Sequence, residues 1–285
     1  MSQSSVLGNL FNSVFKRKGQ QPDFGSDDVA RKVRLEFPQP LLPEPSIHWK
    51  HTLHLQQLAN LPASALSGPV QEDKAAAYRF ISKIVSIRTE TVTSFDMRGL
   101  FGLNHEQDDL LACNSWEALA QSGQCRNIRI ISIRDFNRVL SIAIGKSQSV
   151  NLLSTAWEPR KTYWADPQNT CELAASLVYA RRRELPINLP AQLYRTHINA
   201  GAIRELKKHY HTLGMPVAAW TDPAFMNYLV THKVPYARLP LSLGSLSLQT
   251  ILLPRSSPLA NTFGNGLRQA GAHELSDFLL TLTQA

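Results

Sequence analysis

The sequence predicts an α+β protein with a mostly antiparallel sheet in its first half and a helix-rich second half. Between residues 128 and 155, β-rich runs follow one another without an intervening helix, which favours an antiparallel sheet over a doubly wound one. In the second half, Asp166-Pro167 and Asp222-Pro223 are typical helix starts, with Asp as the N-cap and Pro in the first turn. A content of 43% hydrophobic and 18% charged residues fits a globular chain that can bury a core.

The first 45 residues are predicted to form a flexible basic arm in front of a single globular body over residues 46–285. Within the arm, the apolar residues of segment 4–18 recur with the period of a helix, and the segment ends in a basic cluster. The segment could therefore form a short amphipathic helix that lies on a membrane surface or docks in a partner groove. A frayed tail that packs on its own body is the simpler interpretation. The proline-rich segment 37–45 is expected to be an extended linker, because proline cannot pair in a central strand.

The body is expected to begin with a helix over residues 72–83 and a half-buried strand over residues 84–95, where apolar and polar side chains alternate. A second helix is predicted over residues 108–121, ended by Gly123. Further strands are predicted from β-rich runs at residues 128–133, 139–144 and 150–155. This order of elements places the sheet in the first half of the chain.

Helices dominate the prediction for the second half. The first runs over residues 166–183, and the second begins near residue 199 and ends at Gly214, a typical C-cap glycine. A third, from residue 222, must stop before the proline at 235. A leucine-rich strand over residues 241–253 and a last helix from residue 272 complete the chain.

The net charge of +8 is concentrated in two segments. Residues 1–34 carry six basic and three acidic residues, and residues 181–211 carry seven basic and two acidic residues, so together they hold the whole surplus. On the helix predicted from residue 199, basic side chains three and four positions apart would form one stripe that could bind phosphates or carboxylates. The predicted anion-binding residues are Arg181, Arg182, Arg183, Arg204, Lys207, Lys208 and His211.

Cys113 is the candidate catalytic nucleophile. It lies near the start of the helix predicted over residues 108–121, where the helix dipole would favour a thiolate. A small buried thiol is the simpler interpretation, because a cysteine hydrolase also needs a histidine near the thiol. The downstream candidates have no recognisable motif around them: His197, His209, His211, His232 and His273. The odd number of cysteines, three, further predicts that the chain has no disulfide and belongs to a reducing compartment.

The sequence predicts no metal site and no cofactor. His48, His51 and His54 recur every three residues, but a pair of imidazoles without carboxylate or thiolate ligands is a weak metal site. His209 and His211 would lie on opposite sides of the predicted helix and could not share one ion. Neither glycine-rich motif of the chain has the spacing of a nucleotide-binding loop.

Three segments together resemble an uncharacterised proteobacterial family of unknown function. They are Tyr163-Trp164-Ala165-Asp166-Pro167 continuing to Tyr179-Ala180-Arg181-Arg182-Arg183, then His211 to Trp220, and Pro235-Tyr236-Ala237-Arg238-Leu239. The resemblance covers roughly residues 100–285 and leaves the predicted arm outside. It implies a bacterial, intracellular origin and brings no activity that could be transferred.

We therefore expect a non-enzymatic bacterial binding or regulatory protein, whose basic helix face engages an anionic partner: a nucleic acid, an acidic protein or a membrane surface. One alternative is a cysteine-dependent hydrolase or transferase with Cys113 as nucleophile. Another is a structural or immunity-type interaction protein. A cytoplasmic location is expected, peripheral at a membrane through residues 4–18, since no apolar run is long enough to span a bilayer. The oligomeric state stays open.

Overall fold

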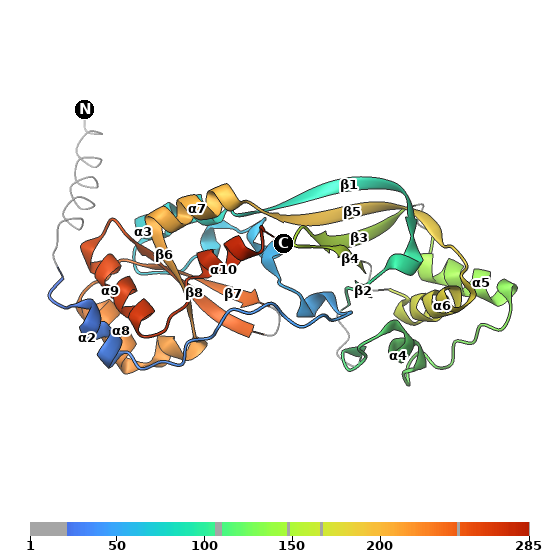
Figure 1. Cartoon of the computed structure of the whole chain (residues 1–285), viewed down its shortest axis with the longest axis horizontal. Coiled ribbons are helices and arrows are strands. Elements are labelled where there is room, and N and C mark those ends of the chain that lie inside the picture. The colour runs from blue at the N-terminus through green and yellow to red at the C-terminus, as the bar shows by residue number, and fades with distance from the viewer. Residues whose placement is uncertain (1–21, 106–109, 147–148, 166–167, 244–245, 285) are drawn as a thin grey trace, which may run out of the picture. The chain divides into compact units, whose positions relative to one another are not determined.

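The computed structural model describes residues 22–105, 110–146, 149–165, 168–243 and 246–284, and Figure 1 labels their helices and strands. The chain divides into two compact units. Unit 1 comprises the described residues of Met1–Leu42, Gln57–Val85 and Ile198–Gln284, and unit 2 comprises those of Pro43–Gln56 and Ser86–His197. The sequence predicts one body from residue 46. Because each unit is assembled from separated stretches of chain, no linker in the sequence marks the division.

Unit 2 is built on a five-stranded sheet with the order β1-β5-β3-β4-β2. The strands are β1 (Val85–Asp96), β2 (Gly102–Leu103), β3 (Val150–Thr155), β4 (Glu158–Trp164) and β5 (Asn188–Ile198). β3 and β4 are antiparallel, whereas β3 pairs with β5 and β2 with β4 in parallel. The α+β class is therefore confirmed, but the sheet is mixed rather than mostly antiparallel. The helix between β4 and β5 carries the chain to the other side of β3, where β5 pairs parallel to it.

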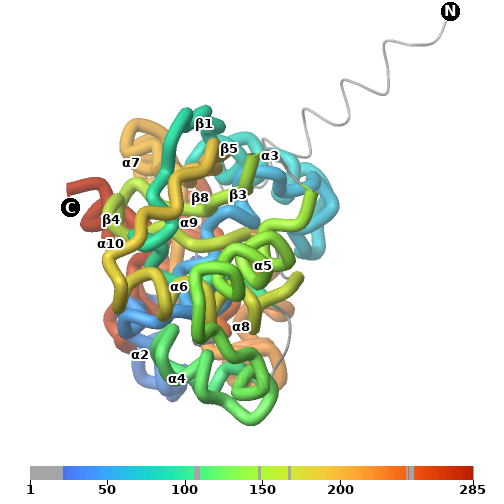
Figure 2. The backbone as a smooth tube through the Cα atoms, turned by 90° about the vertical axis from the view of Figure 1, so that its right-hand side faces the viewer, coloured from blue at the N-terminus to red at the C-terminus, as the bar shows by residue number. Residues whose placement is uncertain are grey.

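The helices of unit 2 are α4 (Trp116–Gln121), α5 (Ile133–Ile144) and α6 (Thr170–Arg183). The strand predicted over residues 139–144 lies within α5, and the one predicted over residues 128–133 is irregular until α5 begins at Ile133, so both predictions were wrong. Ser132 and Asp135 form a capping box at the start of α5, and Phe136, Val139 and Ala143 are buried at helical spacing. Helices α5 and α6 pack against each other (Figure 2). The ring of Phe136 is stacked on that of Tyr179, with 5.5 Å between the centroids.

A disulfide joins Cys125, in the segment after α4, to Cys171 in the first turn of α6. The prediction of a chain without disulfides was therefore wrong. The two cysteines are 46 residues apart and share no recognisable spacing, so only the packing of α4 against α6 brings them together. Cys113 is the free cysteine among the described residues.

Unit 1 contains an antiparallel three-stranded sheet with the order β6-β8-β7. Its strands are β6 (Tyr210–Met215), β7 (Ala237–Leu243) and β8 (Leu246–Pro254). Its helices are α2 (Ser26–Lys32), α3 (Gln71–Ile81), α7 (Ala200–His209), α8 (Pro223–Thr231), α9 (Pro258–Gln269) and α10 (Leu275–Thr281). The helix predicted over residues 199–214 ends at His209, because the next six residues pair with β8 instead.

Residues 22–42, which the sequence assigns to the arm, belong to unit 1. Phe24, Val29 and Val33 are buried in its core, and α2 packs against α9. The approach is close, since a Cβ at Gly266 would lie 2.5 Å from the Cβ of Val29. The predicted amphipathic segment 4–18 lies outside the described residues.

The remaining regular elements are short turns of 3-10 helix: Trp49–His51, Leu55–Leu58, Ala63–Ala65, Met97–Gly99 and Val217–Thr221. The second half of the chain carries strands β5 to β8 as well as helices α6 to α10, so helices and strands alternate there. Of the helices that the structure describes, none combines the length and the apolar character needed to cross a membrane.

Candidate functional site

The predicted anion-binding residues do not form one helix face. His211 lies on β6 and is fully buried, so its place in the basic stripe was predicted wrongly. On α7, Lys207 forms an ion pair with Asp277, and Lys208 forms one with Glu205. Of the predicted stripe, this leaves Arg204 exposed on α7 without an ion pair among the described residues.

The three predicted arginines at the end of α6 differ in role. The guanidinium of Arg181 donates to the backbone oxygens of Leu100, at 2.6 Å, and Arg98, at 3.1 Å, so it holds the loop before β2. Arg182 and Arg183 are exposed. The Arg183 guanidinium lies 6.0 Å from the ring centroid of Tyr179, and it makes no ion pair with any described residue.

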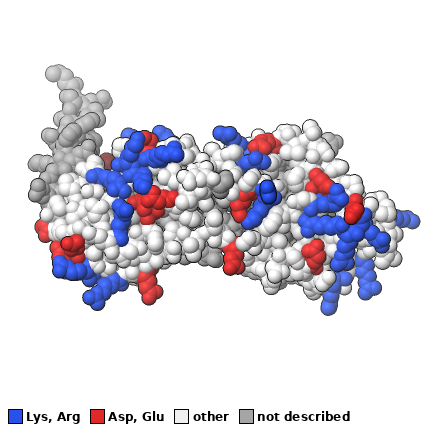
Figure 3. Space-filling model, in the orientation of Figure 1, with Lys and Arg blue, Asp and Glu red and all other residues white. Residues whose placement is uncertain are grey.

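An exposed basic and apolar surface in unit 2 surrounds α5, and the sequence prediction missed it. We define the α5 surface as Arg129, Ile131, Ile133, Arg134, Arg138 and Ile142. The three isoleucines are 87%, 53% and 43% exposed in chain order, and the three arginines are also exposed. Figure 3 shows Lys and Arg side chains gathered over the part of unit 2 that Figure 1 labels α5 and α6.

The arginines of the α5 surface carry unneutralised charge. None of them forms an ion pair with a residue in the described part of the chain, and Arg134, Arg138 and Ile142 follow at intervals of four along one side of the helix. The acidic neighbour Asp135 is occupied, because it accepts hydrogen bonds from the backbone and hydroxyl of Ser132. These hydrogen bonds, with a smaller contribution from Arg138, lower the pKa of Asp135.

Helix α6 packs against α5 so that its last residues, Arg182 and Arg183, lie near the first turn of α5. Phe136 stacks on Tyr179, over which the Arg183 guanidinium lies. At the opposite end, the Asn169 side chain donates to the backbone oxygen of Ile142 at 2.8 Å. The two helices are thus antiparallel neighbours, and arginines far apart in the sequence flank one helix pair. The capping box at Ser132 is the sequence signal that could have revealed α5.

The candidate nucleophile Cys113 lies in the segment before α4 and not within a helix. The Nε2 atom of His48 is 2.6 Å from the backbone oxygen of Cys113, and its Nδ1 atom is 2.7 Å from Nε2 of His105. A carbonyl oxygen only accepts, so Nε2 of His48 donates to it. Burial lowers the pKa of His48, and in the neutral ring Nδ1 accepts from His105.

Both imidazole nitrogens of His48 are therefore engaged. The histidine holds the backbone at Cys113 and is not oriented as a base toward the thiol. His105 was not a candidate from the sequence, and the downstream histidines considered there include His211, which lies in unit 1. Within the described residues, no cluster of three or more His, Cys, Asp or Glu side chains could hold a metal ion.

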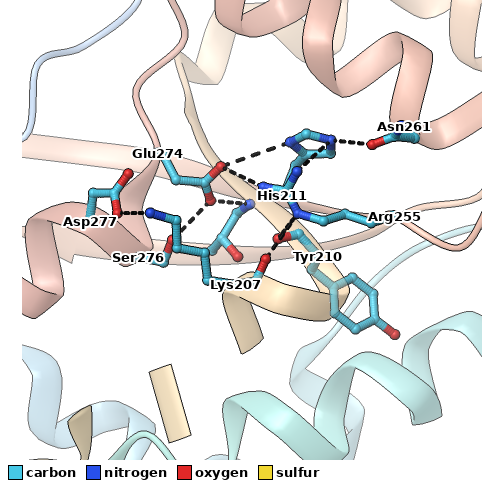
Figure 4. Close-up of polar contacts among 9 residues, drawn as sticks. Lys207, Tyr210, His211, Arg255, Asn261, Glu274, Ser276 and Asp277 are labelled. Carbon is cyan, nitrogen blue, oxygen red and sulfur yellow. Dashed lines mark hydrogen bonds and ion pairs between the residues drawn. The ribbon is translucent and has the colours of Figure 1, made fainter. Parts of the chain in front are cut away.

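A second polar cluster is buried in unit 1 around His211 (Figure 4). Its Nε2 atom lies 2.9 Å from Oδ1 of Asn261 and 3.2 Å from Nη1 of Arg255. Its Nδ1 atom faces Oε2 of Glu274 at 3.9 Å, and Nη2 of Arg255 is 3.5 Å from the same oxygen. The cluster thus joins β6, the end of β8, α9 and the start of α10.

Glu274 is held by further donors. Its Oε1 atom accepts from the backbone nitrogen of Thr212 at 2.6 Å and from the Ser276 hydroxyl at 3.0 Å. Burial raises the pKa of Glu274, whereas burial lowers the pKa of His211 to about 4. At neutral pH the imidazole is therefore uncharged, and Glu274 faces Arg255 as its cationic partner.

The His211 cluster is a structural feature of unit 1. An open pocket of about 410 Å³ lies beside Glu274 and is lined by Arg268, His273 and Asp277 among others. His211, however, has no exposed surface and does not line this pocket. A Cβ at Gly264 would lie 2.6 Å from the His211 ring, so α9 closes over the imidazole. No external substrate could reach His211 in this arrangement.

A family model described as a family of unknown function (DUF6685) matches residues 90–285. The chain belongs to the DUF6685 family. The match confirms the resemblance to an uncharacterised family, and the DUF6685 segment includes the whole α5 surface. Its description gives no activity. Neither a curated protein nor a solved structure matches the chain.

Proposed function

We propose that this DUF6685 protein is a non-enzymatic binding protein and that unit 2 engages an anionic partner through the α5 surface. One observation supports the proposal above all. Three exposed arginines without an ion pair among the described residues lie together with three exposed isoleucines on α5 and in the segment just before it. Guanidinium groups bind phosphates and carboxylates in a bidentate manner, so this surface presents the donors that an anionic partner needs.

The proposal keeps the function class that the sequence predicts and moves the site from α7 to α5. Lys207 and Lys208 are already paired with acidic groups of unit 1. A partner that binds Lys207 or Lys208 would have to replace those ion pairs. Because an exposed ion pair contributes little free energy, exchanging one for another would add little to the affinity. On the α5 surface, no acidic residue in the described part of the chain competes for the arginines.

The arrangement of the two histidine clusters favours binding over catalysis. His48 uses both ring nitrogens in hydrogen bonds to the chain and to His105. His211 is enclosed by α9 and has no exposed surface. Neither cluster combines an accessible nucleophile with an oriented base, which covalent catalysis requires.

The test is the retention of the full chain on immobilised polyphosphate across a salt series. We expect retention that weakens with salt, because each bound phosphate releases counterions. Changing Arg134→Ala together with Arg138→Ala should weaken binding and lower the salt slope by roughly one for each arginine removed. The control is Arg79→Ala with Arg204→Ala, which removes equal charge from exposed helical positions of unit 1. Equally weakened binding in both double variants, or no retention of the unaltered chain, would contradict the proposal.

A further inference from the structure

We propose that the anionic partner is a membrane surface containing acidic phospholipids. In this proposal Ile131, Ile133 and Ile142 enter the headgroup region, while the neighbouring arginines bind lipid phosphates. The inference rests on the proposed function and narrows its partner to one class. It is argued from the exposed apolar side chains, from their arrangement with the arginines, and from how alternative partners would use such a surface.

The isoleucines of the α5 surface expose apolar area to water. Ile131 is 87% exposed, the largest fraction among the large hydrophobic side chains of the described residues. It lies immediately before Ser132, the N-cap of α5, whereas Ile133 and Ile142 lie near the two ends of the helix. Apolar area in contact with water is unfavourable, and burial of an isoleucine recovers most of that free energy. A set of such side chains around one helix therefore indicates a surface that is covered when the protein acts.

Arginines surround these isoleucines. Arg134 and Arg138 lie on the exposed side of α5, and Arg129 precedes it. When a helix lies in a membrane interface, its apolar side chains reach below the phosphates and its arginines extend to them. On α5, Ile133 and Ile142 flank the side that carries Arg134 and Arg138, and the positive charge is complementary to acidic lipids.

Nucleic acid would use this surface poorly. Single strands are bound by stacking bases on exposed aromatic rings. On α5 the ring of Phe136 is buried, and it is stacked on the half-buried Tyr179. Isoleucine has no hydrogen-bonding group for bases or phosphates. Its exposure would remain unexplained if the arginines bound only a phosphate backbone.

An acidic protein would also use it poorly. Stable protein interfaces have a packed apolar centre with a charged rim. Here Arg134 and Arg138 lie between Ile133 and Ile142, so a rigid partner would bury guanidinium groups among the apolar side chains. A fluid lipid surface adapts to separate protruding side chains and keeps the arginines at the hydrated phosphate level.

The experiment is co-sedimentation of the full chain with vesicles of phosphatidylcholine alone or with phosphatidylglycerol as about a third of the lipid. We expect binding to the acidic vesicles, weakened by salt, and little binding to neutral ones. Arg134→Ala with Arg138→Ala should reduce binding about fivefold for each arginine removed. Ile131→Ser with Ile133→Ser should reduce it roughly tenfold and leave retention on polyphosphate unchanged.

The matched control for the isoleucine variant is Val217→Ser with Val230→Ser in unit 1, where the valines are 53% and 68% exposed. This variant should bind acidic vesicles like the unaltered chain. Retention on polyphosphate without vesicle binding would overturn the membrane partner and leave the proposed function standing. If the chain neither is retained on polyphosphate nor binds acidic vesicles, the proposed function and the membrane partner are both overturned. Vesicle binding that is unchanged in the isoleucine variant would also overturn the inference, because charge alone would then suffice.

Discussion

At the scale of single residues, the burial of His211 ties its charge state to the stability of unit 1. Its pKa falls from the ordinary value of 6.5 to about 4 in the fold because burial disfavours the charged ring. Between these values the unfolded chain binds a proton that the folded chain does not. The stability from this residue is therefore complete above about pH 6.5 and is lost as the pH falls toward 4. Glu274, whose pKa is raised by burial, contributes in the opposite direction.

The change His211→Gln should flatten this pH dependence, because glutamine can bond to Asn261 and Arg255 without titrating. In the unaltered chain we expect His211 to lower the free energy of unfolding by about 2 kcal/mol when the pH falls from 7.5 to 5. Urea unfolding at the two pH values measures it. His209→Gln, at an exposed position two residues away, should retain the full pH dependence. An identical fall in stability in both variants would assign the effect to other groups.

At the scale of elements, local signals identified some segments and tertiary pairing decided others. The Asp222 N-cap predicts the start of α8, as observed. The alternation over residues 84–95 predicts a half-buried strand; β1 forms there, but most of its residues after Val85 are exposed. The run over residues 139–144 reads as a strand because Ile and Val favour strands, yet the capping box at Ser132 makes it helical. The end of α7 could not be read from the sequence, since pairing with β8 determines it.

The packing of α2 against α9 makes a second prediction at this scale. In Gly266→Ala the new methyl group would lie 2.5 Å from the Cβ of Val29 and 2.6 Å from the backbone oxygen of Ser26. We expect unit 1 to lose about 1–3 kcal/mol, because backbone must move to make room. Gly201→Ala in α7 is the control, since only the Asn199 side chain is near, at 3.3 Å. Equal unfolding midpoints in urea would show that α2 does not pack on α9 in solution.

At the scale of the whole molecule, the candidate site was only partly predictable. The sequence correctly draws attention to Arg182 and Arg183, which are exposed. It misses Arg134 and Arg138, because the prediction places them in a turn between two strands and not on one element with Ile142. Charge counting by segment could not correct this, since ion pairs such as that of Lys207 with Asp277 depend on residues 70 positions apart. The division of the chain into two units also depends on contacts between residues far apart in the sequence, because each unit is built from separated stretches.

The Cys125–Cys171 disulfide bears on the compartment in which the molecule works. Such bonds persist in oxidising compartments, whereas the sparse cysteines led us to expect a reducing one. In chain produced under oxidising conditions and then denatured without reductant, we expect one reactive thiol, that of Cys113, and three after reduction. Three thiols before reduction would contradict the bond and support the reducing compartment.

Reduction should also weaken unit 2. Closing a loop of 46 residues in the unfolded chain stabilises the fold by about 4 kcal/mol in the chain-entropy description. The unfolding midpoint of unit 2 should therefore fall on reduction, and Cys113→Ser should show the same fall because its thiol takes no part. Because the bond fixes α6, against which α5 packs, reduction should loosen the helix pair that displays the α5 surface. Acidic-vesicle binding that survives reduction would show that this surface is maintained without the bond.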